Sequence, residues 1–193
     1  MAQRRILHDE YFKKAKAEGY LARSAYKLKE IQERHRLLRP GMSVVDLGCA
    51  PGSWLQVASE IVGPKGIVIG IDLQEVPEDL GPNVRTMVGD IFKTDATALL
   101  PDPESKFDVV LSDMAPNTSG HGDDALSVRL CRRVLELLPS LLARRGGCAM
   151  KVLEGSGYSQ LLKDCQRHFA NAKGLKPRAS RDASREIFIV AEG

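Results

Sequence analysis

The stretch SVVDLGCAPGSW, residues 43–54, decides the fold. It starts as a short apolar run that ends in Asp46 and Gly48, as a buried strand does, and a turn with a second glycine then leads into a helical pattern over residues 53–62. Gly48 and Gly52 let the backbone approach a ligand where a Cβ atom would clash. A strand, a glycine turn and a helix in this order predict an α/β sheet that binds its ligand at the carboxyl ends of the strands.

The same alternation continues on both sides of this stretch. We expect further strands over 66–73, 84–90, 107–113 and 147–153, and further helices over 9–18, 23–36, 94–100, 123–143 and 157–169. Residues 173–179 and 185–192 are expected to pair as a terminal antiparallel hairpin. Strands that alternate with helices predict a mostly parallel sheet with helices on both faces.

Composition indicates a single globular domain over residues 1–193, in which a basic helical segment (1–40) precedes the core (41–193). Apolar residues make up 43% of the chain, yet no apolar run reaches the length of a membrane helix, and the first residues lack the apolar core of a secretory signal. The four cysteines form no C-x-x-C pair and the four histidines show no metal-ligand spacing. We therefore expect a cytoplasmic protein with reduced cysteines, without a metal site and without a membrane partner, and a monomer.

Charge is distributed unevenly along the chain. Residues 1–40 hold 11 basic and 5 acidic side chains, residues 41–143 hold 7 and 15, and residues 144–186 hold 10 and 4. Two basic ends around an acidic middle predict that the ends meet in one positive face, which suits a polyanion such as nucleic acid. Ordinary solvated charge is the alternative at this point.

Two acidic residues follow the glycine turn at the ends of predicted strands. Asp72, 24 residues after Gly48, can accept hydrogen bonds from both hydroxyls of a ribose, and Asp90 can contact an exocyclic amine while Ile91 lies against an adenine face. Taken singly, either aspartate is more often a cap of a turn. The glycine spacing is G-x-x-x-G rather than the G-x-G-x-x-G of dinucleotide dehydrogenases, so S-adenosylmethionine is favoured over NAD. The acidic middle of the chain also suits a cationic cofactor better than a diphosphate.

Five motifs in order along the chain resemble the FtsJ/RrmJ family of S-adenosylmethionine-dependent RNA ribose 2′-O-methyltransferases. They are RSAYKLKEI (23–31), DLGCAPGSW (46–54), LSDMAPNTSG (111–120), MKVLEG (150–155) and SREIFIV (184–190). The resemblance implies a Rossmann-like fold with a seven-stranded sheet, and methylation of a uridine in the A-loop of 23S ribosomal RNA in the large subunit. It also implies a catalytic tetrad of Lys27, Asp113, Lys151 and Glu186, with Lys151 as proton acceptor. The implied cofactor contacts are Gly48, Pro51, Gly52, Trp54, Asp72, Leu73, Asp90, Ile91 and Asp113.

Lys151 is unusual because it follows the apolar run Cys148–Met150 in a predicted strand. A lysine accepts a proton only in its neutral form, which burial and a second ammonium favour and which nearby carboxylates oppose. If Lys27 and Lys151 stay charged, they act by positioning the hydroxyl instead. Each residue has an ordinary explanation when taken alone: a lysine whose charged end reaches solvent, a turn cap at Asp113, a cross-strand partner at Glu186, a core side chain at Trp54. The combined pattern outweighs these readings.

The candidate RNA contacts are basic residues near both ends of the chain, namely Arg23, Lys29, Arg34, Lys176, Arg178, Arg181 and Arg185. Tyr26 is a candidate stacking surface. Aromatic residues are only 5% of the chain, so binding should rest on phosphates and shape and weaken with salt. A transfer RNA methyltransferase and a non-catalytic RNA-binding protein on the same fold remain as alternatives.

Overall fold

A mixed sheet forms the centre of the protein, and the computed structural model describes residues 10–76, 79–116, 122–180 and 184–193. The strands are β1 (Ser43–Leu47), β2 (Ile67–Asp72), β3 (Val84–Val88), β4 (Phe107–Ser112), β5 (Leu142–Leu153), β6 (Asn171–Leu175) and β7 (Glu186–Glu192). The helices are α1 (Glu10–Glu18), α2 (Ala25–His35), α3 (Ser53–Val62), the 3-10 helix η1 (Ala96–Leu99), α4 (Asp123–Leu141) and α5 (Tyr158–His168). The expected alternation of strands and helices is confirmed, with small shifts at the ends of elements.

The seven strands of the described sheet lie in the order β3-β2-β1-β4-β5-β7-β6. Strands β1 to β5 pair in parallel, whereas β7 runs antiparallel to both of its neighbours, β5 and β6. The predicted fold class, a mostly parallel sheet that ends in an antiparallel hairpin, is therefore confirmed. The reversal of β7 matters for the site, because it brings the first residue of β7 to the edge where the parallel strands end.

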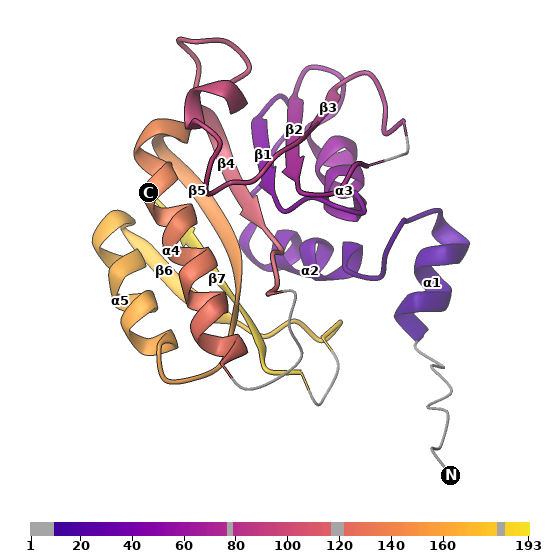
Figure 1. Cartoon of the computed structure of the whole chain (residues 1–193). Helices are drawn as coiled ribbons and strands as arrows, with labels where there is room; N and C mark the ends of the chain where they lie inside the picture. The colour runs from indigo at the N-terminus through magenta and orange to yellow at the C-terminus, as the bar shows by residue number, and fades with distance from the viewer. Residues whose placement is uncertain (1–9, 77–78, 117–121, 181–183) are drawn as a thin grey trace.

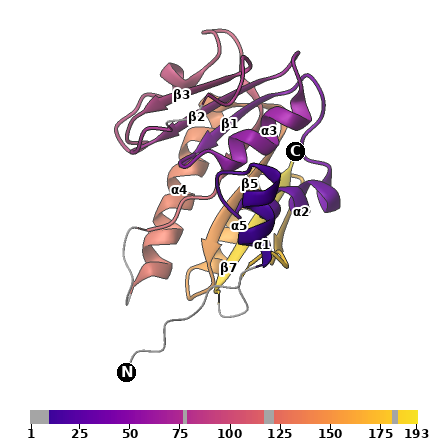
Figure 2. The ribbon, with the colours of Figure 1, turned by 90° about the vertical axis from the view of Figure 1, so that its right-hand side faces the viewer.

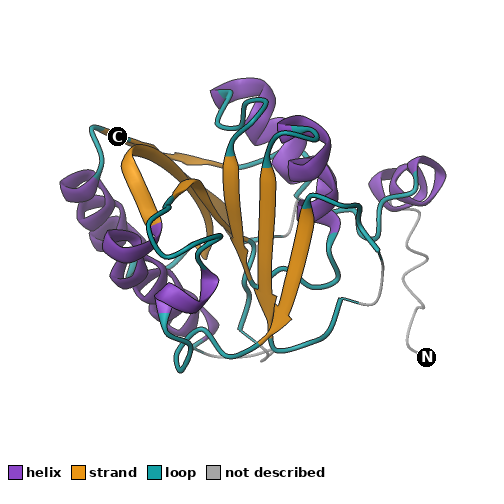
Figure 3. Ribbon diagram, turned by 90° about the horizontal axis from the view of Figure 1, so that it is seen from above, coloured by secondary structure: helices purple, strands orange, loops and turns teal. Residues whose placement is uncertain are grey.

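Helices cover both faces of the sheet (Figures 1 and 3). Helices α4 and α5 pack on one face around a cluster that includes Val110, Val134 and Ile189, and α1, α2 and α3 lie on the other face around Leu28, Trp54 and Phe188 (Figure 2). Central strands that are covered on both sides can be apolar throughout, and four of the five residues of β1 are buried. Charged side chains within such strands are therefore exceptional. Among the described residues, no helix is both long and apolar enough to cross a membrane.

Strand β5 begins earlier than the sequence pattern predicts, at Leu142 rather than residue 147. Leu142 pairs with Phe107 whereas Gly147 pairs with Val109, so the two strands shift register between these pairs. Arg145 lies in this irregular part with φ 66°, in the left-handed region. The prediction started too late because two arginines and two glycines precede the apolar run, and such residues are not typical of a buried strand.

Helix α4 also departs from its predicted role at its first two turns. Six residues were expected on one apolar face: Leu126, Leu130, Val134, Leu137, Leu138 and Leu141. The last four are buried, but Leu126 is 40% exposed and Leu130 is partly exposed, and both line a cavity. The helix continues through Pro139 to Leu141. The amino-terminal end of α4 therefore belongs to the site rather than to the core.

Candidate active site at the carboxyl edge of the sheet

The four residues of the predicted tetrad come together at the carboxyl edge of the sheet. Asp113 directly follows β4 and Lys151 lies near the end of β5, while Glu186 begins the reversed strand β7. Lys27 comes from α2, which packs against the sheet from the side of α3. Parallel strands end at one edge, so residues that are far apart in the sequence meet there.

Lys27 and Glu186 form the first ion pair of the tetrad. The Lys27 ammonium donates to Oε1 and Oε2 of Glu186 at 3.0 and 2.9 Å, and it lies 5.7 Å from the centre of the Phe188 ring. Although burial raises the pKa of Glu186, the ammonium groups of Lys27 and Lys151 outweigh it and hold that pKa below its usual value. Glu186 is therefore an anion at neutral pH.

Lys151 forms the second pair, with Asp113, and links it to the first. Its ammonium lies 2.9 Å from Asp113 Oδ1 and 3.8 Å from Glu186 Oε1, and it donates a hydrogen bond to the main-chain carbonyl of Asp113 at 2.6 Å. Lys27 and Lys151 are only 6% and 7% exposed. A buried ammonium needs such partners, because its desolvation without them costs on the order of several kcal/mol. The four side chains thus form a continuous chain of alternating charge.

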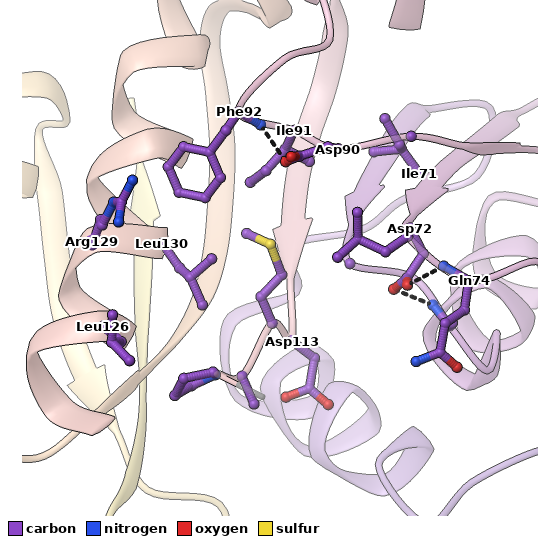
Figure 4. Close-up of a pocket in the computed structure, with 17 residues that line it drawn as sticks. Ile71, Asp72, Gln74, Asp90, Ile91, Phe92, Asp113, Leu126, Arg129 and Leu130 are labelled. Carbon is purple, nitrogen blue, oxygen red and sulfur yellow. Dashed lines mark hydrogen bonds between the residues drawn. The ribbon is translucent and has the colours of Figure 1, made fainter. Parts of the chain in front are cut away.

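A cavity of about 530 Å³ opens beside the tetrad (Figure 4). Six of the predicted cofactor contacts line it, namely Gly48, Asp72, Leu73, Asp90, Ile91 and Asp113. Gly48 has φ 83°, and a Cβ atom there would lie 2.1 Å from Met114 Cγ, so both the turn and the packing favour glycine. Since Asp113 contacts Lys151 and also lines the cavity, the tetrad and the cavity form one site.

The carboxylates of Asp72 and Asp90 hold main-chain N–H groups around the cavity. Asp72 accepts from Ala50 at 3.0 Å and from Gln74 at 2.9 Å, and Asp90 accepts from Phe92 at 2.9 Å (Figure 4). Both aspartates therefore do cap turns, as the alternative interpretation of the sequence expected. Each carboxylate nevertheless lines the cavity and keeps further lone pairs for a ligand.

The remaining predicted cofactor contacts, Pro51, Gly52 and Trp54, are not among the residues that line this cavity. Gly52 has φ 113° just before α3, and a Cβ atom there would lie 3.0 Å from Val76 Cγ1. Trp54 is 2% exposed; its indole N–H donates to the carbonyl of Ser24 at 2.8 Å and its ring lies 5.5 Å from that of Phe188. The Trp54 side chain therefore joins α3 to the start of α2, the helix that carries Lys27.

Asp46, which the sequence reasoning did not select, lies in β1 behind the cavity. It is 1% exposed, and neither carboxylate oxygen has a hydrogen-bond partner within the described chain. Burial, followed by the nearby carboxylates of Asp113 and Asp72, raises the pKa of Asp46 to about 8. The signal was present in the sequence, because Asp46, like Lys151, is a charged residue in an apolar strand.

The far wall of the cavity was also missed. It includes Phe92, Leu126, Leu130 and Arg129, and the Arg129 guanidinium lies 5.0 Å from the centre of the Phe92 ring. Figure 4 shows this wall facing Asp72 and Gln74 across the cavity. Phe92 is 41% exposed, which is unusual for phenylalanine, and its place directly after Asp90 and Ile91 was the available signal.

Three of the predicted RNA contacts, Lys29, Arg34 and Arg178, line a second cavity of about 660 Å³ next to α1 and α2. Glu18, Glu30 and Glu33 line it as well, so the expected positive face is interrupted there by acidic groups. Arg23 donates to the carbonyl of Ala179 at 3.3 Å, Lys176 and Arg185 are exposed, and Arg181 lies outside the described residues.

Tyr26 does not provide the stacking surface considered from the sequence. It is only 6% exposed, and its hydroxyl donates to Glu18 at 2.9 Å. Its ring packs instead against those of Tyr11 and Tyr20. Tyr26 therefore helps to hold α1 and the following loop against α2.

Comparisons with known proteins agree with this geometry. Residues 20–193 match the FtsJ-like methyltransferase family. A protein named ribosomal RNA large subunit methyltransferase E from Syntrophobacter fumaroxidans is 45% identical, with 95% of this chain and 94% of that protein aligned. Its namesake from Acinetobacter baumannii is 44% identical, with 98% and 89% aligned. A crystal structure of a putative ribosomal RNA methyltransferase from Plasmodium falciparum has a TM-score of 0.78 at 27% identity and covers 90% of this chain and 98% of its own.

Proposed function

Since this chain belongs to the FtsJ-like methyltransferase family, we propose that it methylates a ribose 2′-hydroxyl of large-subunit ribosomal RNA and uses S-adenosylmethionine as methyl donor. The observation that carries the proposal is the position of Asp113, which lines the cavity and contacts Lys151 of the tetrad. A methyl donor in the cavity and a hydroxyl at the tetrad would thus be neighbours. The family comparison supports methyl transfer, and the names of the relatives support the RNA.

The residues of the cavity fit S-adenosylmethionine. Asp46 is buried without a hydrogen-bond partner in the described chain, beside the carboxylates of Asp113 and Asp72. Such a group favours a ligand that brings positive charge. When bound, S-adenosylmethionine supplies an electrophilic methyl group on a cationic sulfur. We assign Asp72 and Leu73 to its ribose, Asp90 and Ile91 to its adenine, and Gly48 to the close approach of the backbone.

Pro51, Gly52 and Trp54 have a different part in this proposal. Pro51 and Gly52 shape the turn before α3, and Gly52 provides the left-handed backbone that this turn requires. Trp54 acts through its hydrogen bond to Ser24, three residues before Lys27. The Trp54 side chain therefore positions the tetrad rather than the cofactor.

In the proposed mechanism, the tetrad binds and orients the hydroxyl that becomes methylated. Lys27 is held by Glu186, and Lys151 by Asp113 and Glu186, so both nitrogen atoms have fixed positions. Alignment of the hydroxyl with the methyl group supplies a large part of such a rate enhancement. Lys151, once neutral, accepts the proton that the hydroxyl loses as its oxygen bonds to the methyl carbon. The bond between sulfur and the methyl carbon would break in the same step, and a neutral thioether would leave.

We further propose that the modified nucleotide is the A-loop uridine of 23S ribosomal RNA and that the enzyme acts as a cytoplasmic monomer. The proposed phosphate contacts are Arg23, Lys29, Arg34, Lys176, Arg178, Arg181 and Arg185. Phosphate contacts make binding weaken steeply with salt.

The test is methyl transfer from labelled S-adenosylmethionine to purified large-subunit particles, free ribosomal RNA and transfer RNA. We expect label on a single ribose of the large-subunit RNA, mapped by the resistance of the adjacent bond to alkaline cleavage. Label on a base atom would contradict ribose methylation. Label only on transfer RNA would mean that transfer RNA, and not ribosomal RNA, is the substrate. RNA binding without any methyl transfer would indicate a non-catalytic RNA-binding protein.

A further inference from the structure

Four exposed arginines lie at the edge of the sheet opposite the active site, and the proposed mechanism gives them no role. Arg36 and Arg39 lie in the segment between α2 and β1, and Arg144 and Arg145 lie in the first turn-like part of β5. The Leu37 side chain packs next to Gly147, so the two segments are in contact. We call these four residues the arginine edge. Strands β1 and β5 begin next to it, at Ser43 and Leu142.

The side chains of the arginine edge form no ion pair and no hydrogen bond within the described residues. One acidic side chain near the start of β5 is already engaged by hydrogen bonds within the sheet. The Asp108 carboxylate accepts hydrogen bonds from the main-chain N–H and the hydroxyl of Ser43. The guanidinium groups are therefore free to contact a partner.

The backbone gives a second, independent observation. Arg36, with φ 52°, and Arg145, with φ 66°, are the two non-glycine residues in the left-handed region within the described chain. Arg36 occupies the residue after α2, where the N–H donates to Gln32 and where glycine is the usual choice. Glycine would relieve both conformations, so the arginine side chains offer something that folding alone does not require.

We propose that the arginine edge binds the phosphate backbone of a second RNA segment of the ribosomal particle, away from the methylated nucleotide; this inference rests on the proposed function. Guanidinium groups bind phosphate through paired hydrogen bonds. Arg145 lies six residues before Lys151 in β5, roughly 20 Å at 3.3 Å per residue, and Arg36 lies nine residues after Lys27 at the end of α2, roughly 14 Å at 1.5 Å per residue, so the edge lies on the order of 14–20 Å from the tetrad. One nucleotide cannot span that distance, but an assembled particle presents several RNA segments at fixed positions. The arginine edge thus favours the particle over a short RNA.

The first test reverses charge at the two arginines with ordinary backbone, in the double variant Arg39→Glu/Arg144→Glu. Its matched control is Arg132→Glu/Lys163→Glu, which changes the net charge equally at exposed positions on α4 and α5. Binding to large-subunit particles is measured at several salt concentrations, together with methylation of particles and of a short RNA that contains the target loop. We expect the edge variant to bind particles roughly tenfold more weakly, with a salt slope smaller by about one for each lost phosphate contact. Its rate on the short RNA should equal that of the control.

A second variant guards against a loss through misfolding. Arg36→Gly/Arg145→Gly relieves the left-handed backbone and should keep or raise the unfolding temperature, yet it should also weaken particle binding. Particle binding equal to that of the control would overturn the proposal. Equal losses on particles and short RNA would also overturn it, and so would a loss that does not depend on salt, which indicates a protein partner. If the wild type methylates neither RNA, the proposed function fails. Particle binding by the edge and control variants at several salt concentrations would still test whether the arginine edge binds RNA.

Discussion

Two regions at the carboxyl edge of the sheet contain carboxylates, and they differ in how far the protein neutralises those carboxylates. In the tetrad, each carboxylate has an ammonium partner: Lys27 lies 2.9 Å from Glu186 and Lys151 lies 2.9 Å from Asp113. In the cavity, Asp72 binds only main-chain N–H groups within the described chain, and Asp90 adds to its main-chain contact a longer ion pair with Lys93 at 3.8 Å. Asp46, behind the cavity, has no hydrogen-bond partner in the described chain. Asp113 stands at the boundary and belongs to both.

This difference indicates what each region needs from a ligand. The tetrad is electrically balanced by the protein itself, so it can hold a neutral hydroxyl and handle its proton. Around the cavity, carboxylates outnumber cationic groups, because Asp72, Asp90 and Asp113 line it together with one arginine, Arg129, so the cavity gains from a cationic ligand. The acidic excess of residues 41–143, which the sequence shows only as a total, is in part this local imbalance. The following changes, in order of expected effect, test the division.

The largest effect is expected for Lys151→Ala. It removes the proposed proton acceptor, so we expect the methyl transfer rate to fall by about 100-fold or more, the usual contribution of a general base. Cofactor affinity should stay near that of wild type, because Lys151 does not line the cavity among the described residues. Single-turnover transfer and calorimetric titration with S-adenosylmethionine measure the two quantities.

Lys151→Arg is the matched control for charge. Arginine keeps the positive charge near Asp113 but does not give up its proton at any working pH. Loss of activity in this variant, with unchanged thermal unfolding, supports proton transfer. An active arginine variant would mean that position 151 contributes charge alone.

Asp72→Ala should affect the cavity and leave the tetrad intact. The change removes the acceptor for Ala50 and Gln74 and the proposed ribose contact. We expect cofactor affinity to fall about tenfold or more, since hydrogen bonds to a charged group contribute about 1.5–3 kcal/mol. The rate at saturating cofactor should change little. A fall in that rate with unchanged cofactor affinity would show that Asp72 acts on the tetrad, so that the cavity and the tetrad are not separable.

Asp46→Asn should alter the pH dependence of stability. The pKa of Asp46 is raised to about 8 in the folded protein, so its contribution is fully present below about pH 4, the unfolded value, and is lost as pH rises through about 8. The variant lacks this titration, so its stability should fall less than that of the cofactor-free wild type between pH 5 and pH 9. Chemical unfolding at several pH values measures the difference.

Saturation with S-adenosylmethionine should reduce this contrast, because a nearby cation favours the ionised carboxylate. Identical pH profiles for Asp46→Asn and the cofactor-free wild type would show that Asp46 is already balanced in the free protein. The expected gain from a cationic ligand would then lose its support from Asp46.

The smallest effect is expected for Trp54→Phe. Phenylalanine keeps an aromatic ring near Phe188 but removes the N–H that donates to Ser24. We expect the maximal rate to fall by a few fold, as a shift of Lys27 weakens the alignment of the hydroxyl. Cofactor affinity should not change. The opposite result, weaker cofactor binding at an unchanged rate, would place Trp54 in the cofactor site.

Much of the site was predictable because parallel strands make its geometry regular. Asp72 ends β2 and Asp90 comes shortly after β3, so their place at one edge is a consequence of the fold. The link between Lys27 and Glu186, 159 residues apart, could not come from periodicity and depended on the family motifs. Asp46 was not predicted as a site residue, although it is a charged residue in an apolar strand as Lys151 is, because it was taken to mark the end of the strand.

Other features leave no trace in the hydrophobic pattern. Leu126 and Leu130 continue the apolar stripe of α4, and nothing in the stripe tells where the helix leaves the core and begins to line a cavity. The left-handed backbone of Arg145 is set by the register shift between β4 and β5. Such a shift depends on how two strands pair, so the start of β5 could not be found from its own residues.

The reversed direction of strand β7 has a consequence for the folding of the nascent chain. It is synthesised after the other six strands of the described sheet, yet it must insert between β5 and β6, and its first residue is Glu186. Until then β5 lacks a neighbour on one side and Lys27 lacks its carboxylate partner. The same seven residues therefore complete the sheet and the tetrad together, so a nascent chain that stops before them has neither a complete sheet nor a complete tetrad.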